Sequence, residues 1–166
     1  MHKWLAIATD AKNSSDGLAA KIRSFPSVRG HLERSLELNP DDAAVLHLLG
    51  KWCYDMSRLS GFRRFVVTAL YDSPPECDLE EARDYLTRAV ELQSTCYYIP
   101  TLYVLGRTCM RLRQYLRARH YLYLASCMPA RTDYERFCVR KSKALVAQLD
   151  RYDLGEECLL CESEKL

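Results

Sequence analysis

The sequence predicts an all-α protein built as an array of about three helix pairs. Two stretches, LLGKWCYDMSRL (48–59) and VLGRTCMRLRQY (104–115), share a Leu-Gly pair with Cys three places after the glycine. Each is followed by a segment in which Ala, Leu and Ala recur at i, i+4 and i+7, the spacing of one helix face. Only 6 Gly and 6 Pro among 166 residues disfavour an all-β or loop-rich chain.

The two glycines explain how the helices pair. Inside a helix, glycine costs about 1 kcal/mol relative to alanine. That cost is offset if the first helix of each pair crosses the second so closely that a larger side chain would push them apart. We therefore expect Gly50 to face Ala82 and Gly106 to face Ala118. The pattern resembles the tetratricopeptide repeat, which implies antiparallel helix pairs stacked in a right-handed superhelical array.

Residues 1–150 are predicted to form a single tetratricopeptide-like domain. Its helix pairs and the helix that ends it are expected at approximately 1–40, 43–94, 99–130 and 132–150. The last of these is a capping helix, because Thr132 followed by Glu135 three places later is a capping box. Residues 151–166 form an acidic tail that we expect to be disordered.

The second pair contains a long insertion. Gly106 and Ala118 are 12 residues apart, whereas Gly50 and Ala82 are 32 apart, so the second pair has 20 additional residues, approximately 57–76. Its central FRRFVVTAL is expected to extend the first helix. In the first pair, Trp4 is predicted as the large packing residue of the first helix. The predicted core comprises Leu46, Leu49, Leu86, Ala89, Leu102, Leu105, Leu122, Ala125, Leu145 and Leu149.

The eight cysteines are scattered and lie mostly at apolar helix positions. The start of the chain does not resemble a signal peptide, so we interpret them as reduced, buried thiols of a cytosolic protein. Cys158 and Cys161 form the one close pair, but a structural zinc site needs four ligands and no further pair or His lies nearby. No metal site and no cofactor are predicted.

Charge is distributed unevenly. Residues 1–96 carry 12 Lys/Arg and 14 Asp/Glu, residues 97–152 carry 11 and 3, and residues 153–166 carry 1 and 5. Repeat position predicts a concave, partner-binding groove lined by His47, Lys51, Tyr54, Tyr103, Arg107 and Met110. A basic patch is expected to continue it at Arg111, Arg113, Arg117, Arg119, Arg140 and Lys141. An ordinary solvated helix face is the alternative interpretation of the patch.

The sequence also resembles the regulator of microtubule dynamics family. The matching motifs are Asn39-Pro40-Asp41-Asp42, His47-Leu48-Leu49-Gly50, Tyr54, Ser57-x-Leu59-Ser60, Thr68-Ala69-Leu70-Tyr71 and Ser73-Pro74-Pro75. One departure is Phe62, which stands where the family has a Trp-like aromatic and is displaced one place by Gly61.

The resemblance implies a non-enzymatic adaptor of the cytoplasm and cytoskeleton that associates with microtubules and spindle poles and acts in chromosome segregation. We expect its partner to be the acidic surface of tubulin. The alternatives are a phospholipid-binding or lipid-transfer domain and a generic peptide-binding scaffold. Nucleic acid is not expected as a partner, because no nucleic-acid motif accompanies the basic residues. The four histidines form no catalytic pattern, so no enzymatic activity is predicted.

Overall fold

The computed structural model describes residues 1–15, 18–58, 77–93 and 97–151. This part of the chain contains seven helices and no strand, which confirms the all-α class. The helices group into two compact units, an N-terminal unit (Met1–Leu92) and a C-terminal unit (Gln93–Leu166). The superhelical sense of the array stays a prediction. Within the described residues, no helix combines the length and the apolar character needed to span a membrane.

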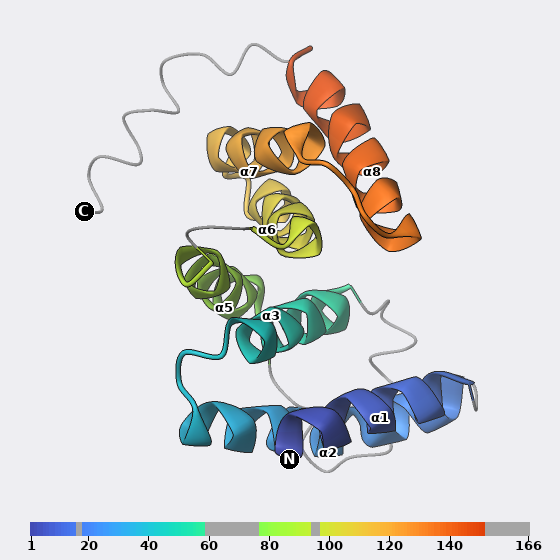
Figure 1. Ribbon diagram of the computed structural model, residues 1–166. Helices are drawn as coiled ribbons and strands as arrows, with labels where there is room; N and C mark the ends of the chain where they lie inside the picture. Colours follow the sequence, from blue (N-terminus) through green and yellow to red (C-terminus); the bar gives the residue numbers. More distant parts are fainter. Residues whose placement is uncertain (16–17, 59–76, 94–96, 152–166) are drawn as a thin grey trace. The chain divides into compact units, whose positions relative to one another are not determined.

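The described residues of the N-terminal unit form four helices in two pairs (Figure 1). Helix α1 (His2–Ser15) packs against α2 (Leu18–Leu38), and α3 (Ala43–Ser57) packs against α5 (Leu79–Glu91). Asp42 starts α3, because its Oδ1 accepts hydrogen bonds from the backbone N–H groups of Ala44 and Val45 at 3.0 and 3.2 Å. Lys3 of α1 donates to the other oxygen of Asp42 at 2.8 Å, which ties the two pairs together.

Gly50 lies where α3 crosses α5. A Cβ added to it would stand 2.5 Å from Cγ of Leu86 and 3.0 Å from the carbonyl oxygen of Ala82. Both distances are shorter than a van der Waals contact, so the two helix backbones approach closely only because position 50 has no side chain. This confirms the predicted contact of Gly50 with Ala82, and adds Leu86 as the larger obstacle to a side chain.

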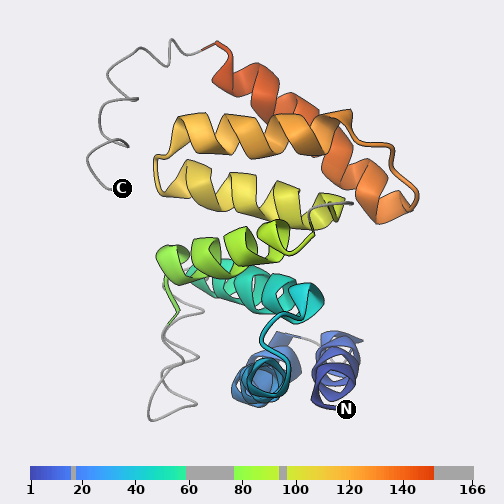
Figure 2. The same cartoon turned by 60° about the vertical axis from the view of Figure 1, so that its left-hand side comes forward.

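The C-terminal unit repeats the same crossing and adds one helix. Helices α6 (Ile99–Arg111) and α7 (Tyr115–Cys127) lie side by side (Figure 2). A Cβ at Gly106 would stand 2.6 Å from Cγ of Leu122 and 3.3 Å from the carbonyl oxygen of Ala118. The turn between α6 and α7 places Arg113 at φ 62°, the left-handed conformation that favours glycine.

Helix α8 (Asp133–Leu149) packs against both α6 and α7. Its start is the predicted capping box: Thr132 Oγ1 accepts from the Glu135 N–H at 3.1 Å, and Glu135 Oε2 accepts from the Thr132 N–H at 3.0 Å. Cys138, Ser142 and Leu149 form the buried face of this helix. The helix expected at 132–150 is therefore confirmed within one residue at each end.

The predicted core is confirmed at nine of its ten positions, and Leu145 is the exception. Leu145 is only half-buried, because α8 is the last described helix and its outer flank is open. The prediction for Trp4 was wrong. Its side chain is 69% exposed, because α1 turns Ala6 inward and Trp4 lies about 200° around the helix from that position. Most of the insertion (59–76) and of the acidic tail (152–166) lie outside the described residues.

The cysteines are not all reduced, buried thiols, contrary to the prediction. Cys53 and Cys77 form a disulfide, with their Cα atoms 5.2 Å apart, within the usual range for this bond. Cys109 and Cys138 are buried free thiols, as expected, but Cys127 is exposed. The disulfide was missed because 24 residues separate its ends in sequence, and the helix pairing removes that separation in space. Cys96, Cys158 and Cys161 lie outside the described residues.

Candidate functional site

The predicted groove residues of the N-terminal unit come from α3, and two of the three face inward. His47 and Tyr54 are buried, at 7% and 3% exposure. Burial, together with the charge of the neighbouring Lys51 ammonium, lowers the pKa of His47 to about 4. Lys51 is more accessible, but its ammonium pairs with Asp55 at 2.6 Å. In this part of the predicted groove, the accessible cation is therefore Lys51, whose charge is already neutralised by Asp55.

The predicted groove residues of the C-terminal unit come from α6 and are arranged differently. Tyr103 is 6% exposed, and the guanidinium of Arg107 lies over its ring, 5.3 Å from the centroid. Arg107 Nη1 also donates to Tyr103 Oη at 3.3 Å. The ring thus holds the guanidinium in place by a cation–π contact and a hydrogen bond. Met110, one turn from Gly106, is half-buried.

Helix α8 adds side chains that the sequence analysis did not place in the groove. The rings of Tyr103 and Phe137 meet edge to face, with centroids 6.3 Å apart, and Tyr134 stacks on Phe137 at the same distance. The ammonium of Lys141 lies 5.7 Å from the centroid of Phe137. We call these five residues, Tyr103, Arg107, Tyr134, Phe137 and Lys141, the aromatic–cationic cluster. Tyr134, Phe137 and Lys141 share one face of α8 at i, i+3 and i+7, a signal the sequence did contain.

The outer part of this cluster is accessible. Tyr134 is 47% exposed and Phe137 is 37% exposed, although both are large aromatic side chains. Exposed aromatic rings beside cations are typical of binding surfaces. The rings supply contact area, and the cations supply charge. The inner part, Tyr103 with Arg107, anchors the cluster to α6.

Glu135 and Cys138, which lie next to the cluster on α8, have structural roles. Glu135 caps α8, and hydrogen bonds from the backbone N–H groups of Arg131 and Thr132 lower the pKa of its carboxyl. Burial raises the pKa of the Cys138 thiol, and the Glu135 carboxylate adds to the rise. The thiol therefore stays protonated near neutral pH and is a packing residue, not a nucleophile.

The six predicted basic-patch residues are all exposed, but they do not form one continuous strip on a single helix. Arg111 and Arg113 lie at the turn after α6, Arg117 and Arg119 on α7, and Arg140 and Lys141 on α8. Arg119 pairs with Asp150 at 2.6 Å, so part of its charge is compensated. In the part of the chain that the structure describes, no carboxylate pairs with Arg140 or Lys141, and Lys141 belongs to the aromatic–cationic cluster.

The fold and this surface define an all-helical protein with two glycine-crossed helix pairs and a net positive charge in residues 97–152. The family described as regulator of microtubule dynamics protein 1-3 matches residues 1–150, so the chain belongs to this family. This confirms the resemblance seen in the sequence.

Individual relatives agree with the family assignment. The chain is 33% identical over 135 residues to regulator of microtubule dynamics protein 1 of Rattus norvegicus, covering 81% of this chain and 43% of the relative. The protein of the same name from Homo sapiens matches to the same extent. Regulator of microtubule dynamics protein 3 of Xenopus laevis is 32% identical over 136 residues, covering 81% of this chain and 29% of the relative. The chain thus spans less than half the length of these relatives.

Proposed function

We propose that this chain is a microtubule-associated binding module. Its C-terminal unit is proposed to hold an acidic peptide segment, such as the glutamate-rich tails of tubulin, on the aromatic–cationic cluster and the neighbouring Arg140. Two findings support the proposal. The chain belongs to a family named for the regulation of microtubule dynamics. The cluster presents two cations, Arg107 and Lys141, on a platform of aromatic rings.

The aromatic–cationic cluster is the observation on which the proposal rests. Rings hold the two cations at fixed places, so less side-chain entropy is lost when a carboxylate binds them. The surrounding segment, residues 97–152, carries 11 Lys/Arg and 3 Asp/Glu, a net charge of +8. A positive field of this kind increases the rate at which an acidic partner associates, and the increase falls as salt screens it.

The proposed site is narrower than the groove predicted from the sequence. Lys51 is paired with Asp55, and His47 and Tyr54 are buried, so the N-terminal unit is not assigned a share of the binding. The proposed activity is binding without catalysis. The arginine, lysine and aromatic side chains of the cluster would supply charge and contact area to an acidic partner.

Microtubule co-sedimentation at increasing salt tests the proposal. We expect the double variant Arg140→Glu/Lys141→Glu to lose most of its binding, because it reverses two exposed charges at the cluster. The matched control is Arg34→Glu/Arg88→Glu, which makes the same change in net charge at exposed positions of the N-terminal unit. The control should retain binding if the site, and not total charge, matters.

Two further arms identify the partner. Microtubules whose acidic tails have been removed by limited proteolysis should bind the wild-type chain weakly. Flotation with vesicles of phosphatidic acid and phosphatidylcholine tests the phospholipid alternative. Equal pelleting of both double variants would refute the proposed site, and flotation without pelleting would replace the microtubule by an anionic lipid.

A further inference from the structure

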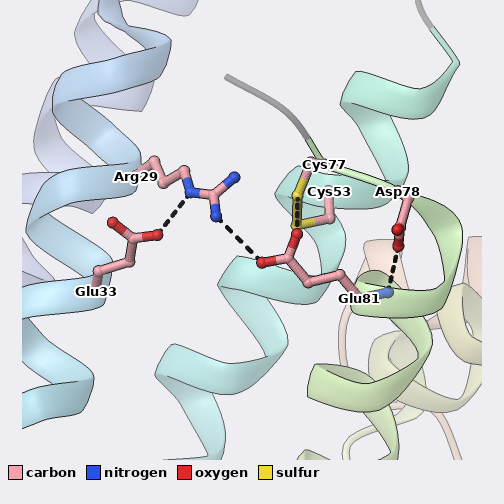
Figure 3. A network of polar contacts seen from close by, with 6 residues as sticks. All are labelled: Arg29, Glu33, Cys53, Cys77, Asp78 and Glu81. Atoms are coloured by element: carbon pink, nitrogen blue, oxygen red, sulfur yellow. Dashed lines mark hydrogen bonds and ion pairs between the residues drawn. A yellow bond between two sulfur atoms is a disulfide. The ribbon is translucent and has the colours of Figure 1, made fainter.

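Three side chains that can bind metal meet at one end of the α3–α5 crossing (Figure 3). They are Cys53 of α3, Cys77 immediately before α5, and Glu81 in the first turn of α5. Their sulfur and carboxylate oxygen atoms all lie within 4.8 Å of one another. Cys53 is buried at 1% exposure, whereas Cys77 and Glu81 are half-buried, so the cluster opens to solvent on one side.

The helix pairing brings these residues together. Cys53 lies three residues after Gly50, and Glu81 lies one residue before Ala82, so both flank the close crossing. Asp78, the residue after Cys77, is the N-cap of α5 and accepts a hydrogen bond from the Glu81 N–H at 2.6 Å. This bond fixes the start of α5 and holds Cys77 and Glu81 at one place.

Arg29 orients the carboxylate of Glu81. Its Nη2 lies 3.1 Å from Glu81 Oε1, and the other carboxylate oxygen, Oε2, lies 3.1 Å from Cys77 Sγ (Figure 3). Arg29 is itself held by Glu33, at 2.6 Å, and by the ring of Trp52, 5.4 Å from its guanidinium carbon. One oxygen of Glu81 is thus engaged by Arg29 while the other faces the sulfurs, the arrangement in which a charged neighbour fixes a metal-binding carboxylate.

We propose that, in its reduced form, this cluster is a Zn²⁺ site with Cys53 Sγ, Cys77 Sγ and Glu81 Oε2 as ligands and water as the fourth. Thiolate sulfur and carboxylate oxygen are ligands that Zn²⁺ accepts, and three protein ligands with one water form an open tetrahedral site. Bonds of about 2.3 Å to sulfur and 2.1 Å to oxygen separate tetrahedral ligands by roughly 3.5–3.8 Å. The observed cluster, within 4.8 Å, reaches this spacing by side-chain rotation.

The charges of the site are nearly balanced. Two thiolates and one carboxylate carry three negative charges, and Zn²⁺ leaves one of them uncompensated. The Arg29 guanidinium on Glu81 Oε1 lies beside that remaining charge.

The disulfide and the metal site exclude one another. Reduction adds two electrons and two protons to the Cys53–Cys77 bond and gives two thiols. Zn²⁺ binding then releases these two protons to solvent as the thiolates form. In the disulfide neither sulfur carries a thiolate charge, so the oxidised chain has no site. The oxidised protein is therefore a built-in negative control.

Titration of the full chain with Co²⁺ and Zn²⁺ tests the proposal. A phosphine reductant first opens the disulfide, supplying the two electrons and becoming a phosphine oxide. Without air, the reduced chain should bind one equivalent of Co²⁺ with the absorption of a tetrahedral thiolate complex, and Zn²⁺ should abolish that absorption. Metal analysis after desalting should give one Zn²⁺ per chain for the reduced protein and none for the oxidised one.

Single and double substitutions identify which side chains bind the metal. Cys77→Ser should remove the cobalt–thiolate absorption, and Glu81→Gln should weaken binding at least tenfold. Both positions are half-buried, and far-UV circular dichroism should show that these variants remain folded. Cys127→Ser and the double variant Cys158→Ser/Cys161→Ser should bind metal like the wild type.

Two outcomes would overturn the proposal. One is metal uptake by the reduced wild type that does not exceed that of Cys77→Ser. The other is absorption that survives in Cys77→Ser and disappears in Cys158→Ser/Cys161→Ser, which would place the metal at the C-terminal cysteine pair. Neither outcome bears on microtubule binding, because the two proposals use different units of the chain.

Discussion

The α3–α5 pair and the α6–α7 pair share one crossing and differ in almost everything else. A Cβ at Gly50 would meet Leu86 Cγ at 2.5 Å, and a Cβ at Gly106 would meet Leu122 Cγ at 2.6 Å. The connections, in contrast, run from Arg58 to Asp78 in the first pair and from Leu112 to Gln114 in the second. The chemistry of the crossing therefore defines a helix pair, while the length of its connection is free to vary.

Polymer physics explains why the longer connection is tolerated. For an ideal chain the closure entropy grows only with the logarithm of length, so going from 3 to 21 residues costs on the order of 2 kcal/mol. The Cys53–Cys77 bond spans the same gap, with a sequence separation of 24. A disulfide closing a loop of that size stabilises by about 3 kcal/mol, enough to offset the longer connection.

The largest expected effect comes from filling the two crossings. Gly106→Leu and Gly50→Leu should each lower the free energy of unfolding by about 3 kcal/mol, because the new side chain must displace Leu122 or Leu86. Urea denaturation followed by circular dichroism measures the change. Gly30→Ala is the matched control, since a Cβ there would meet nothing within 4 Å, and it should stabilise α2 by up to about 1 kcal/mol. Equal stability of all three variants would show that the pairing does not depend on the crossings.

The second effect depends on pH and belongs to the α3–α5 pair alone. His47 and Tyr103 occupy the same repeat position, three residues before the crossing glycine, and burial lowers the pKa of the histidine. The pKa of His47 is about 4 when folded and about 6.5 when unfolded, so the unfolded chain binds its proton first. Stability from the neutral, buried ring is present above pH 6.5 and falls as the pH drops to about 4, by up to about 3 kcal/mol.

Denaturant melts of the wild type and His47→Gln at pH 7 and pH 5 measure this effect. The variant should lose less stability between the two pH values than the wild type. His120→Gln is the control, because His120 is exposed. Parallel pH profiles of the wild type and His47→Gln would contradict the assignment.

A smaller difference is expected at the starts of the second helices. Asp78 caps α5 through its bond to the Glu81 N–H, whereas Gln114 at the start of α7 makes no side-chain cap bond. Asp78→Ala should therefore cost about 1 kcal/mol. Gln114→Ala should change stability by less than about 0.5 kcal/mol, since its Oε1 has no hydrogen-bond partner among the described residues. The difference between the two variants in urea midpoint is the measurement, and equal losses would argue against the cap.

The smallest expected effect is a gain at the short turn of the α6–α7 pair. Arg113 has φ 62°, a conformation that costs a residue with a Cβ roughly 1 kcal/mol and glycine very little. Arg113→Gly should therefore raise the thermal midpoint of the chain slightly, whereas Arg111→Gly, inside α6, should lower it. A lower midpoint for Arg113→Gly would indicate that the arginine side chain contributes more than the backbone strain.

The sequence by itself determined the helix pairs, their crossing residues and the cap of α8. These features depend on short-range patterns: the helical period, a glycine opposite a small residue, and a Thr–Glu box. Each pattern involves residues that are close in sequence, so each could be predicted without knowing what the helix packs against.

Only the tertiary structure decided which faces are covered and which distant side chains meet. Helical periodicity placed His47, Tyr54 and Tyr103 on the predicted groove face, but the packing of the folded chain buries all three. The aromatic rings of α8 join Arg107 of α6, and Arg29 reaches Glu81, because helix packing brings these parts of the chain together. The physical reason is that a local pattern fixes the direction of a side chain along its own helix, whereas its burial and its partners depend on helices far away in sequence.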